Sequence, residues 1–186
     1  MYNRILIVGS TASGKTGLAK MLSNIFNSSP YSTDDFVYKE KHNIKYSEEE
    51  RNERLRLVLN QKKWIIEGVH SSPWFVQAFQ KADLVIILCL SRRVLFKRVI
   101  VRNFQREKKF EGLFFLLRNA YVYRNDRFIK HKELARKFEK RVIILHSTRE
   151  IKNLFYLFQI NTKLSNPKAI TKIQEIMFLD LSEFDS

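Results

Sequence analysis

The segment from Gly9 to Thr16 constrains the fold of this chain more than any other part of its sequence. It reads Gly-Ser-Thr-Ala-Ser-Gly-Lys-Thr and matches the pattern G-x-x-x-x-G-K-[ST] at every fixed position. An apolar, β-branched run over 4–8 precedes it, and apolar residues at helical spacing follow it over 15–26. This order predicts a buried strand, a tight loop and an amphipathic helix, which is typical of a loop that binds phosphate groups.

The residue types of this segment explain how it would hold a phosphate group. Glycines let the backbone turn so tightly that several N–H groups point to one centre, and the following helix adds its positive end. Lys15 supplies a mobile charge for the β and γ phosphates of a nucleotide, and the Thr16 hydroxyl is placed to bind Mg²⁺. A ligand-free turn would not need Lys and Thr at these positions. We therefore assign ATP and Mg²⁺ as cofactors, and assign nucleotide binding to Gly9, Ser10, Thr11, Ala12, Ser13, Gly14, Lys15 and Thr16.

The size and composition of the chain fit one globular domain in a reducing compartment. Its 186 residues are 45% hydrophobic, which is enough to bury a core and excludes a disordered chain. The single cysteine, Cys89, excludes an internal disulfide and a zinc site made of several thiolates. No signal peptide is visible, and the longest apolar runs fall well short of the roughly 18 residues that a membrane helix needs. We therefore expect a cytoplasmic protein with no membrane partner.

Apolar strands alternate with helices along the chain. The expected strands are 4–8, a segment near 31–32, 64–67, 83–90 and 142–145. The expected helices are 15–26, 48–60, 93–109, 112–123, a stretch that ends near 139, and 148–158. Strands that are apolar throughout belong to a parallel sheet covered on both faces. The sequence thus predicts an α/β fold.

The positive charge of the chain is concentrated in one segment. Lysines and arginines number 34 against 19 acidic residues, which gives a net charge of +15. The segment 91–141 carries 17 of the basic residues and five of the acidic ones, a net charge of +12, whereas 161–186 has a net charge of −1. The segment 91–141 therefore suits a polyanionic partner, nucleotide phosphates or nucleic acid, although a solvated helix surface has the same composition. We expect a domain over 1–160, with a tail or docking helix over 161–186.

Further segments of the sequence resemble one group of proteins. The run 64–68 reads Trp-Ile-Ile-Glu-Gly, a strand that ends in an acid and a glycine. After the apolar run 82–88, Arg98 and Arg102 lie four residues apart on one helix face, and the run 141–148 is a last strand followed by His-Ser-Thr. Together with the phosphate loop, these segments resemble the adenylate-kinase-like small P-loop kinases, and among them the DNA topology modulation proteins, over roughly residues 2–158.

The resemblance implies a fold and an activity. The fold is that of P-loop NTPases, three-layer α/β/α with a five-stranded parallel sheet, with a basic helical lid over about 103–130. The activity is transfer of the γ-phosphate from ATP·Mg²⁺ to a nucleotide, a nucleoside or another small acceptor. After the fourth strand, Cys89 and Ser91 occupy positions where relatives often have an acid and a proline. No motif specific for shikimate, gluconate or thymidylate is evident.

Three acidic residues are candidates for binding the metal and the acceptor. Glu67 ends an apolar strand at the edge where doubly wound sheets bind ligands, so we assign it to Mg²⁺, through a bridging water or behind the direct ligands, with a cap on the following loop as the alternative. Asp34 and Asp35 follow the expected second strand. We assign Asp34 as the catalytic base toward an acceptor hydroxyl and Asp35 to the acceptor site. The alternatives for both are a metal ligand, a helix cap or a turn residue.

Four arginines of the basic segment are candidates for catalysis. Arg98 and Arg102 are assigned to the transferring phosphoryl group, because planar guanidinium groups bind such charge through paired hydrogen bonds. Arg124 and Arg127 lie in the second half of the expected lid and are assigned to close over the γ phosphate. The alternative for all four is a basic helix surface.

Arg51 and Arg54 are candidates for holding the acceptor. They lie on a helix whose start is marked by a capping-box pattern, Ser47 with Glu50, and relatives bind their acceptor at this helix. The alternative is that they pair with neighbouring glutamates. Three aromatic residues are candidates for stacking on a base, although core packing is their usual role: Trp74, Phe75 and Tyr38. We interpret three histidines, which lack the spacing of metal ligands, as ordinary polar residues: His70, His131 and His146.

The favoured function is therefore an ATP-dependent kinase with a small acceptor. One alternative is a nucleic-acid-associated P-loop ATPase or a polynucleotide 5′-kinase that uses the segment 91–141. Another is a nucleotide-binding regulator with little turnover, which the missing acid at Cys89 favours. The sequence leaves the acceptor and the oligomeric state open, since the apolar run 113–117 fits a lid core or a dimer surface equally.

Overall fold

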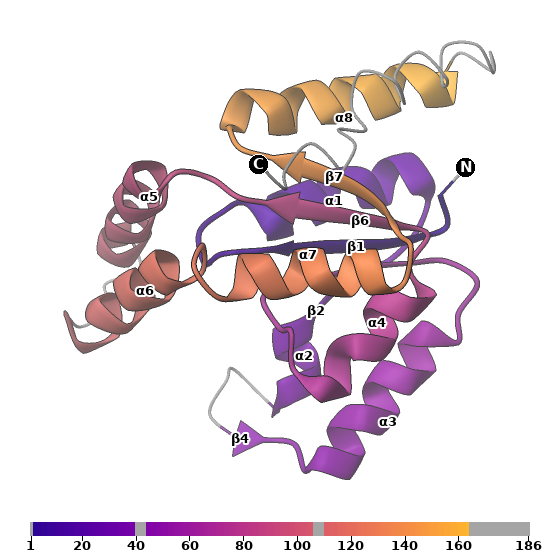
Figure 1. Cartoon of the computed structure of the whole chain (residues 1–186), viewed down its shortest axis with the longest axis horizontal. Coiled ribbons are helices and arrows are strands. Elements are labelled where there is room, and N and C mark those ends of the chain that lie inside the picture. The colour runs from indigo at the N-terminus through magenta and orange to yellow at the C-terminus, as the bar shows by residue number, and fades with distance from the viewer. Residues whose placement is uncertain (1, 40–43, 106–109, 164–186) are drawn as a thin grey trace.

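Five short runs of the sequence form one parallel sheet in the computed structural model, which describes residues 2–39, 44–105 and 110–163 (Figure 1). Continuous apolar runs favour this arrangement, because strands inside a parallel sheet are covered on both faces. The order across the sheet is β2 (Pro30–Ser32), β5 (Trp64–Gly68), β1 (Arg4–Gly9), β6 (Leu84–Leu88) and β7 (Arg141–Leu145). The predicted five-stranded parallel sheet is confirmed.

The register of the sheet aligns the carboxyl ends of its strands. Gly9 of β1 pairs with Leu88 of β6, and Ser32 at the end of β2 pairs with Glu67 near the end of β5. The segments that follow these strands therefore leave the sheet along one edge, which is where open parallel sheets bind their ligands.

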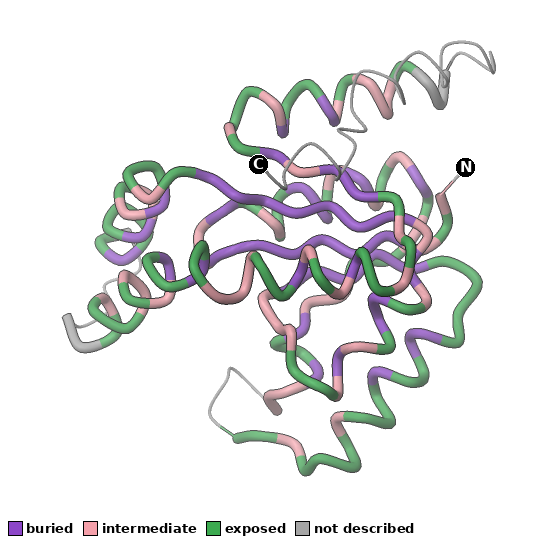
Figure 2. Tube along the Cα trace, viewed as in Figure 1, coloured by how far each residue is buried: buried purple, intermediate pink, exposed green. Residues whose placement is uncertain are grey.

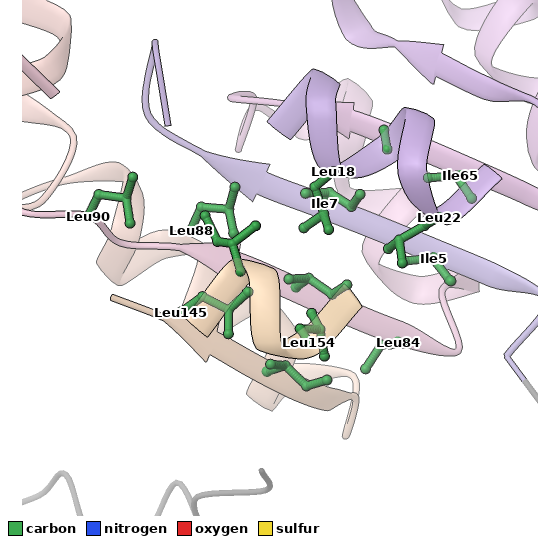
Figure 3. Close-up of a cluster of buried hydrophobic side chains, with 14 of the residues drawn as sticks. Ile5, Ile7, Leu18, Leu22, Ile65, Leu84, Leu88, Leu90, Leu145 and Leu154 are labelled. Carbon is green, nitrogen blue, oxygen red and sulfur yellow. The ribbon is translucent and has the colours of Figure 1, made fainter. Parts of the chain in front are cut away.

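Helices cover both faces of the sheet and complete the three layers. One face is covered by α1 (Lys15–Phe26) and α8 (Thr148–Lys163), and the other by α3 (Glu48–Leu59), α4 (Val76–Lys81) and α7 (Arg127–Lys137). Because side chains alternate along a strand, Ile5 and Ile7 of β1 belong to the first core, and Leu6 and Val8 belong to the second. Figure 2 shows burial concentrated along the strands, and Figure 3 shows the first core between the sheet, α1 and α8.

The structure adds short elements that the sequence patterns did not indicate. They are α2 (Thr33–Val37), the antiparallel pair β3 (Tyr38–Lys39) and β4 (Ile44–Lys45), the 3-10 turn η2 (Pro73–Phe75), and α4. The longest of them, α4, has six residues, which is too short to show a helical period in the sequence.

Two helices lie beyond the carboxyl ends of the strands, α5 (Arg92–Gln105) and α6 (Phe110–Val122) (Figure 1). The predicted lid, 103–130, corresponds to the end of α5, all of α6 and the start of α7, with 106–109 outside the described residues. The last helix, α8, extends to Lys163 instead of the predicted 158, so the predicted tail begins as helix, and 164–186 lie outside the described residues. Within the described ranges, no helix is long and apolar enough to cross a membrane.

His131 of α7 is a core residue rather than the ordinary polar residue that the sequence predicted. It is fully buried, with its Nδ1 3.0 Å from the Tyr123 hydroxyl and its Nε2 3.1 Å from the His70 carbonyl oxygen. A carbonyl only accepts hydrogen bonds, so Nε2 carries the proton and Nδ1 accepts from Tyr123. The neutral ring thus joins α7 to the end of α6 and to the loop after β5.

We expect His131 to make the stability of the protein depend on pH. Burial lowers its pKa to about 4, against the smaller raising effect of the His70 carbonyl. The unfolded chain takes up this proton near pH 6.5, so stability falls as the pH decreases from about 6.5 to about 4, by about 3 kcal/mol. In urea unfolding across this range, His131→Gln should show a pH dependence that is smaller by that amount. An equal pH dependence in both proteins would contradict a neutral, buried ring.

Candidate functional site

The loop between β1 and α1 has the backbone of a tight anion-binding turn. Gly9 lies so close to β6 that a Cβ there would be 2.9 Å from the Leu88 Cβ, closer than real contacts. Ala12 has a φ of 61° and Gly14 a φ of 102°, and Gly14 directly precedes α1. Left-handed residues in such a loop turn successive N–H groups toward one point, ahead of the positive end of the helix.

Lys15 folds back over this loop, where its Nζ donates a hydrogen bond of 2.9 Å to the Ser10 carbonyl oxygen. Burial lowers the pKa of Lys15 and Arg102 acts in the same direction, whereas Glu67 and Asp34 oppose them. Charged groups from β5, α2 and α5 therefore surround the ammonium group.

Thr16 and Glu67 supply oxygen atoms that suit a magnesium ion. The Thr16 hydroxyl donates to Glu67 Oε1 at 2.8 Å, and Glu67 is only 6% exposed. Glycine follows it at position 68 because a Cβ there would overlap the Thr33 side chain. Hydroxyl and carboxylate oxygens are donors that Mg²⁺ prefers, so this pair fits the metal. Within the described residues, no group of three or more His, Cys, Asp or Glu side chains is arranged to hold a metal ion.

The two aspartates after β2 have different surroundings. The Ser32 hydroxyl accepts from the Asp34 N–H, and the Ser32 N–H donates to Asp35 Oδ2, each at 3.3 Å. Asp35 therefore caps α2, which is the alternative that its sequence position left open. Asp34 lies close enough to Lys15 and His70 to raise the pKa of both against the effect of burial. Asp34 thus faces the phosphate loop and the segment after β5.

Arg98 and Arg102 lie on adjacent turns of α5 and have different neighbours. Arg98 donates to the carbonyl oxygens of Ala12 and Ser13 at 3.3 and 3.0 Å, and to the Thr148 hydroxyl at 2.7 Å. Arg102 is exposed and lies within electrostatic range of the ammonium group of the loop. The structure therefore binds Arg98 to the loop itself and leaves Arg102 beside the lysine.

Arg124 and Arg127 also lie beside different parts of the structure. Arg124 lies near the thiol of Cys89, a buried residue that directly follows β6; burial raises the pKa of that thiol, and the charge of Arg124 opposes this shift. Burial lowers the pKa of His70 and His131, and the charge of Arg127 adds to this effect in both. Arg127 therefore lies beside the loop after β5, whereas Arg124 lies at the end of β6.

A second polar cluster lies on α3 and the segment after β5. The Arg51 guanidinium lies over the Trp74 ring, 4.8 Å from its centroid, and the His70 ring meets Trp74 edge-on at 5.1 Å. Burial lowers the pKa of His70; among the nearby charges, Asp34 opposes this shift, and Arg51 and Lys15 add to it. His70 therefore lies between the phosphate loop and the Arg51–Trp74 pair.

Arg54, one turn along α3 from this cluster, has a different neighbour. Its guanidinium lies over the Tyr46 ring at 4.4 Å, and the residue is exposed. Phe75, a stacking candidate from the sequence, is fully buried in the core. Sequence reasoning did not select His70 for the site. The signal available was its place in the chain, two residues after Gly68.

Comparisons with known proteins bear on the fold. No family model matches the sequence, and no curated protein matches it. Among solved structures, shikimate kinase from Bacteroides thetaiotaomicron has a TM-score of 0.55 and 18% identity, over 88% of this chain and 100% of that one. Shikimate kinase from Acinetobacter baumannii, in complex with shikimate, has a TM-score of 0.53 and 15% identity, over 99% of this chain and 96% of that one. This chain therefore shares its three-layer α/β/α fold with these two kinases, and the fold predicted from the sequence is confirmed.

Proposed function

We propose that this chain is a kinase that transfers the γ-phosphate of ATP·Mg²⁺ to a small acceptor. One observation carries the proposal: Thr16 and Glu67 meet at 2.8 Å beside Lys15, in a fold shared with two kinases. The neighbouring cluster of His70 and Arg51 supports it further, because transfer requires a place for an acceptor next to the phosphate loop.

Each residue of the site has a separate role in the proposed transfer. Bound Mg²⁺ neutralises phosphate charge, and Thr16 and Glu67 are the residues that would hold it. The loop N–H groups and Lys15 bind the β and γ phosphates, and Arg102 neutralises charge that develops on the transferred group. Asp34 accepts the proton of an acceptor hydroxyl. A phosphate acceptor needs no such base, because positioning and charge neutralisation then suffice.

The acceptor site favours a small molecule with a negative charge. Stacking on Trp74 fixes the plane of the Arg51 guanidinium. Its Nε and Nη2 donate to Asn52 Oδ1 at 3.3 Å, and Nη2 lies 3.9 Å from Glu48 Oε1, so a carboxylate or a phosphate would bind at Nη1 or displace these partners. Arg127 adds positive charge from α7. A nucleotide or another anionic small molecule meets these requirements, whereas an uncharged nucleoside does not use Arg51.

Within the small P-loop kinases, we place the chain with the DNA topology modulation proteins of the cytoplasm. The support is the sequence of the Glu67–Gly68 strand end and the spacing of Arg98 and Arg102.

The first test measures ADP release from ATP·Mg²⁺ with a panel of acceptors. The panel contains nucleoside monophosphates, nucleosides, small hydroxy acids and 5′-hydroxyl oligonucleotides. We expect one anionic class of acceptor to stimulate ADP release. Lys15→Ala should reduce the stimulated rate by about 100-fold or more, because it removes the ammonium group that neutralises charge on the transferred phosphate. Lys20→Ala, an exposed lysine on the same helix, is the matched control. Tight nucleotide binding without transfer to any acceptor would favour the regulator instead.

The second test separates the two arginines of α3. We expect Arg51→Met to raise the KM for the acceptor by about 10- to 100-fold, because a charged hydrogen bond is lost, and to leave the KM for ATP nearly unchanged. Arg54→Met removes the same charge from the same helix and should have little effect on either constant. Steady-state kinetics with each substrate varied in turn measures this. Equal effects of the two substitutions would place the acceptor elsewhere.

Action on nucleic acid is a second candidate function. The observation that favours it is the outer surface of α5 and α6, where three phenylalanines are 61 to 75% exposed: Phe104, Phe114 and Phe115. Lys97 and Arg118 are exposed on the same helices, and the described stretches 91–105 and 112–125 contain no acidic residue. Basic groups combined with exposed aromatic rings bind single strands through backbone charge and base stacking.

This candidate predicts binding that depends on salt and on one aromatic ring. A fluorescent single-stranded oligonucleotide should bind at low salt, with affinity that falls steeply as KCl increases. Phe114→Ala should weaken binding by about 10-fold, whereas Tyr156→Ala, which alters an aromatic residue of α8 that is 58% exposed, should not. Fluorescence anisotropy measures both. The candidate is wrong if no complex forms at low salt.

A further inference from the structure

Arg98 connects two segments that lie far apart in the sequence. One nitrogen of its guanidinium donates to the carbonyl oxygens of Ala12 and Ser13, and the other donates to the Thr148 hydroxyl. Thr148 begins α8, whose start is held by Ser147: its hydroxyl accepts from the Glu150 N–H at 3.1 Å. Arg98 thus joins the phosphate loop to the junction between β7 and α8.

The position of Arg98 on α5 is fixed by its neighbours. Leu95 lies one turn before Arg98 on the helix and Val99 directly follows it, and their side chains are only 2% and 1% exposed. The guanidinium also lies against the turn itself, since a Cβ on Gly14 would be 3.6 Å from its nitrogen. The helix therefore holds the arginine in place, and the arginine holds the loop.

The contact determines which way the loop's peptide groups point. In a planar trans peptide, the N–H points opposite to the carbonyl that precedes it. Because the Ser13 carbonyl points to Arg98, the Gly14 N–H points away from Arg98. The same contact supports Ala12 at a φ of 61°, which a residue with a side chain rarely adopts.

We propose that Arg98 is a positioning residue that keeps the phosphate loop in its binding conformation, and that it acts through the Ala12 and Ser13 carbonyls rather than by touching the transferred phosphate. This inference rests on the proposed function in one respect, namely that the loop binds a nucleotide. It gives Arg98 a role different from that of Arg102, although the sequence assigned both to the phosphoryl group. Arg98 determines affinity for every ligand that uses the loop N–H groups.

The test compares three ligands that share phosphates and differ in their other parts: ATP, ADP and inorganic tripolyphosphate. Arg98→Met should weaken binding of all three by a similar factor, about 10-fold, because all three use the same loop N–H groups. Arg98→Lys should restore part of the affinity, since an ammonium group can still donate to one carbonyl. Arg93→Met, an exposed arginine of the same helix, controls for the loss of one charge. Calorimetry measures the dissociation constant of each ligand directly, and competition against a tighter ligand measures it for those that bind more weakly.

Each other pattern overturns the inference in a recognisable way. A loss confined to ATP would mean that Arg98 touches the γ phosphate. A loss with ATP and ADP but not with tripolyphosphate would mean that it touches the nucleoside. An equal affinity of Arg98→Met and wild type would mean that the loop does not need it. If wild type binds none of the three ligands, the proposed function itself is wrong.

A spectroscopic readout in the free protein separates positioning from a general loss of stability. In Arg98→Met without any ligand, the chemical shift of the Gly14 amide proton should change. The chemical shifts of amide protons in β1, such as that of Ile7, should remain the same. The Arg93→Met spectrum should match wild type at both positions. An unchanged Gly14 signal in Arg98→Met would contradict the proposed role.

Discussion

The close approach of β1 and β6 at Gly9 determines where every other part of the site lies. β1 is paired on both sides, so its carboxyl end sets the point at which the phosphate loop begins. A Cβ on Gly9 would lie 2.9 Å from both the Leu88 Cβ and the Ser13 hydroxyl, so the missing side chain lets the loop fold directly against the neighbouring strand. The helix that follows then starts next to β5, where Thr16 reaches Glu67.

The acids of the site have one role in the free protein and another in the proposed reaction. In the free protein, Glu67 and Asp34 stabilise the ammonium group of Lys15 against the effect of burial. In the proposed reaction, phosphate charge takes over that task, and the same carboxylates turn to the metal and to the acceptor. A chain with a net charge of +15 therefore keeps negative charge where a buried cation needs it in the absence of ligand.

The parts of the fold that the sequence predicted are those with long local patterns. The apolar strands, the phosphate loop and the helix capped by Ser47 and Glu50 each span enough residues to show a period or a fixed spacing. Contacts made only by folding could not be read in this way. Nothing in the spacing of Arg98 shows that it faces carbonyls, and nothing around His131 shows that it is buried between Tyr123 and a backbone oxygen.

The two halves of the proposed site differ in how far a backbone fold and a short sequence motif define them. The proposed donor half is almost continuous in sequence, and one loop and one strand end define it. The proposed acceptor half is built from side chains on α2, α3, α7 and the segment after β5. The backbone of that segment is held by His131 at the His70 carbonyl, whereas the His70 and Trp74 rings and Arg51 are held by contacts between side chains. In the proposed function, the identity of the acceptor therefore depends on these three side chains, and a likeness of backbones cannot supply it.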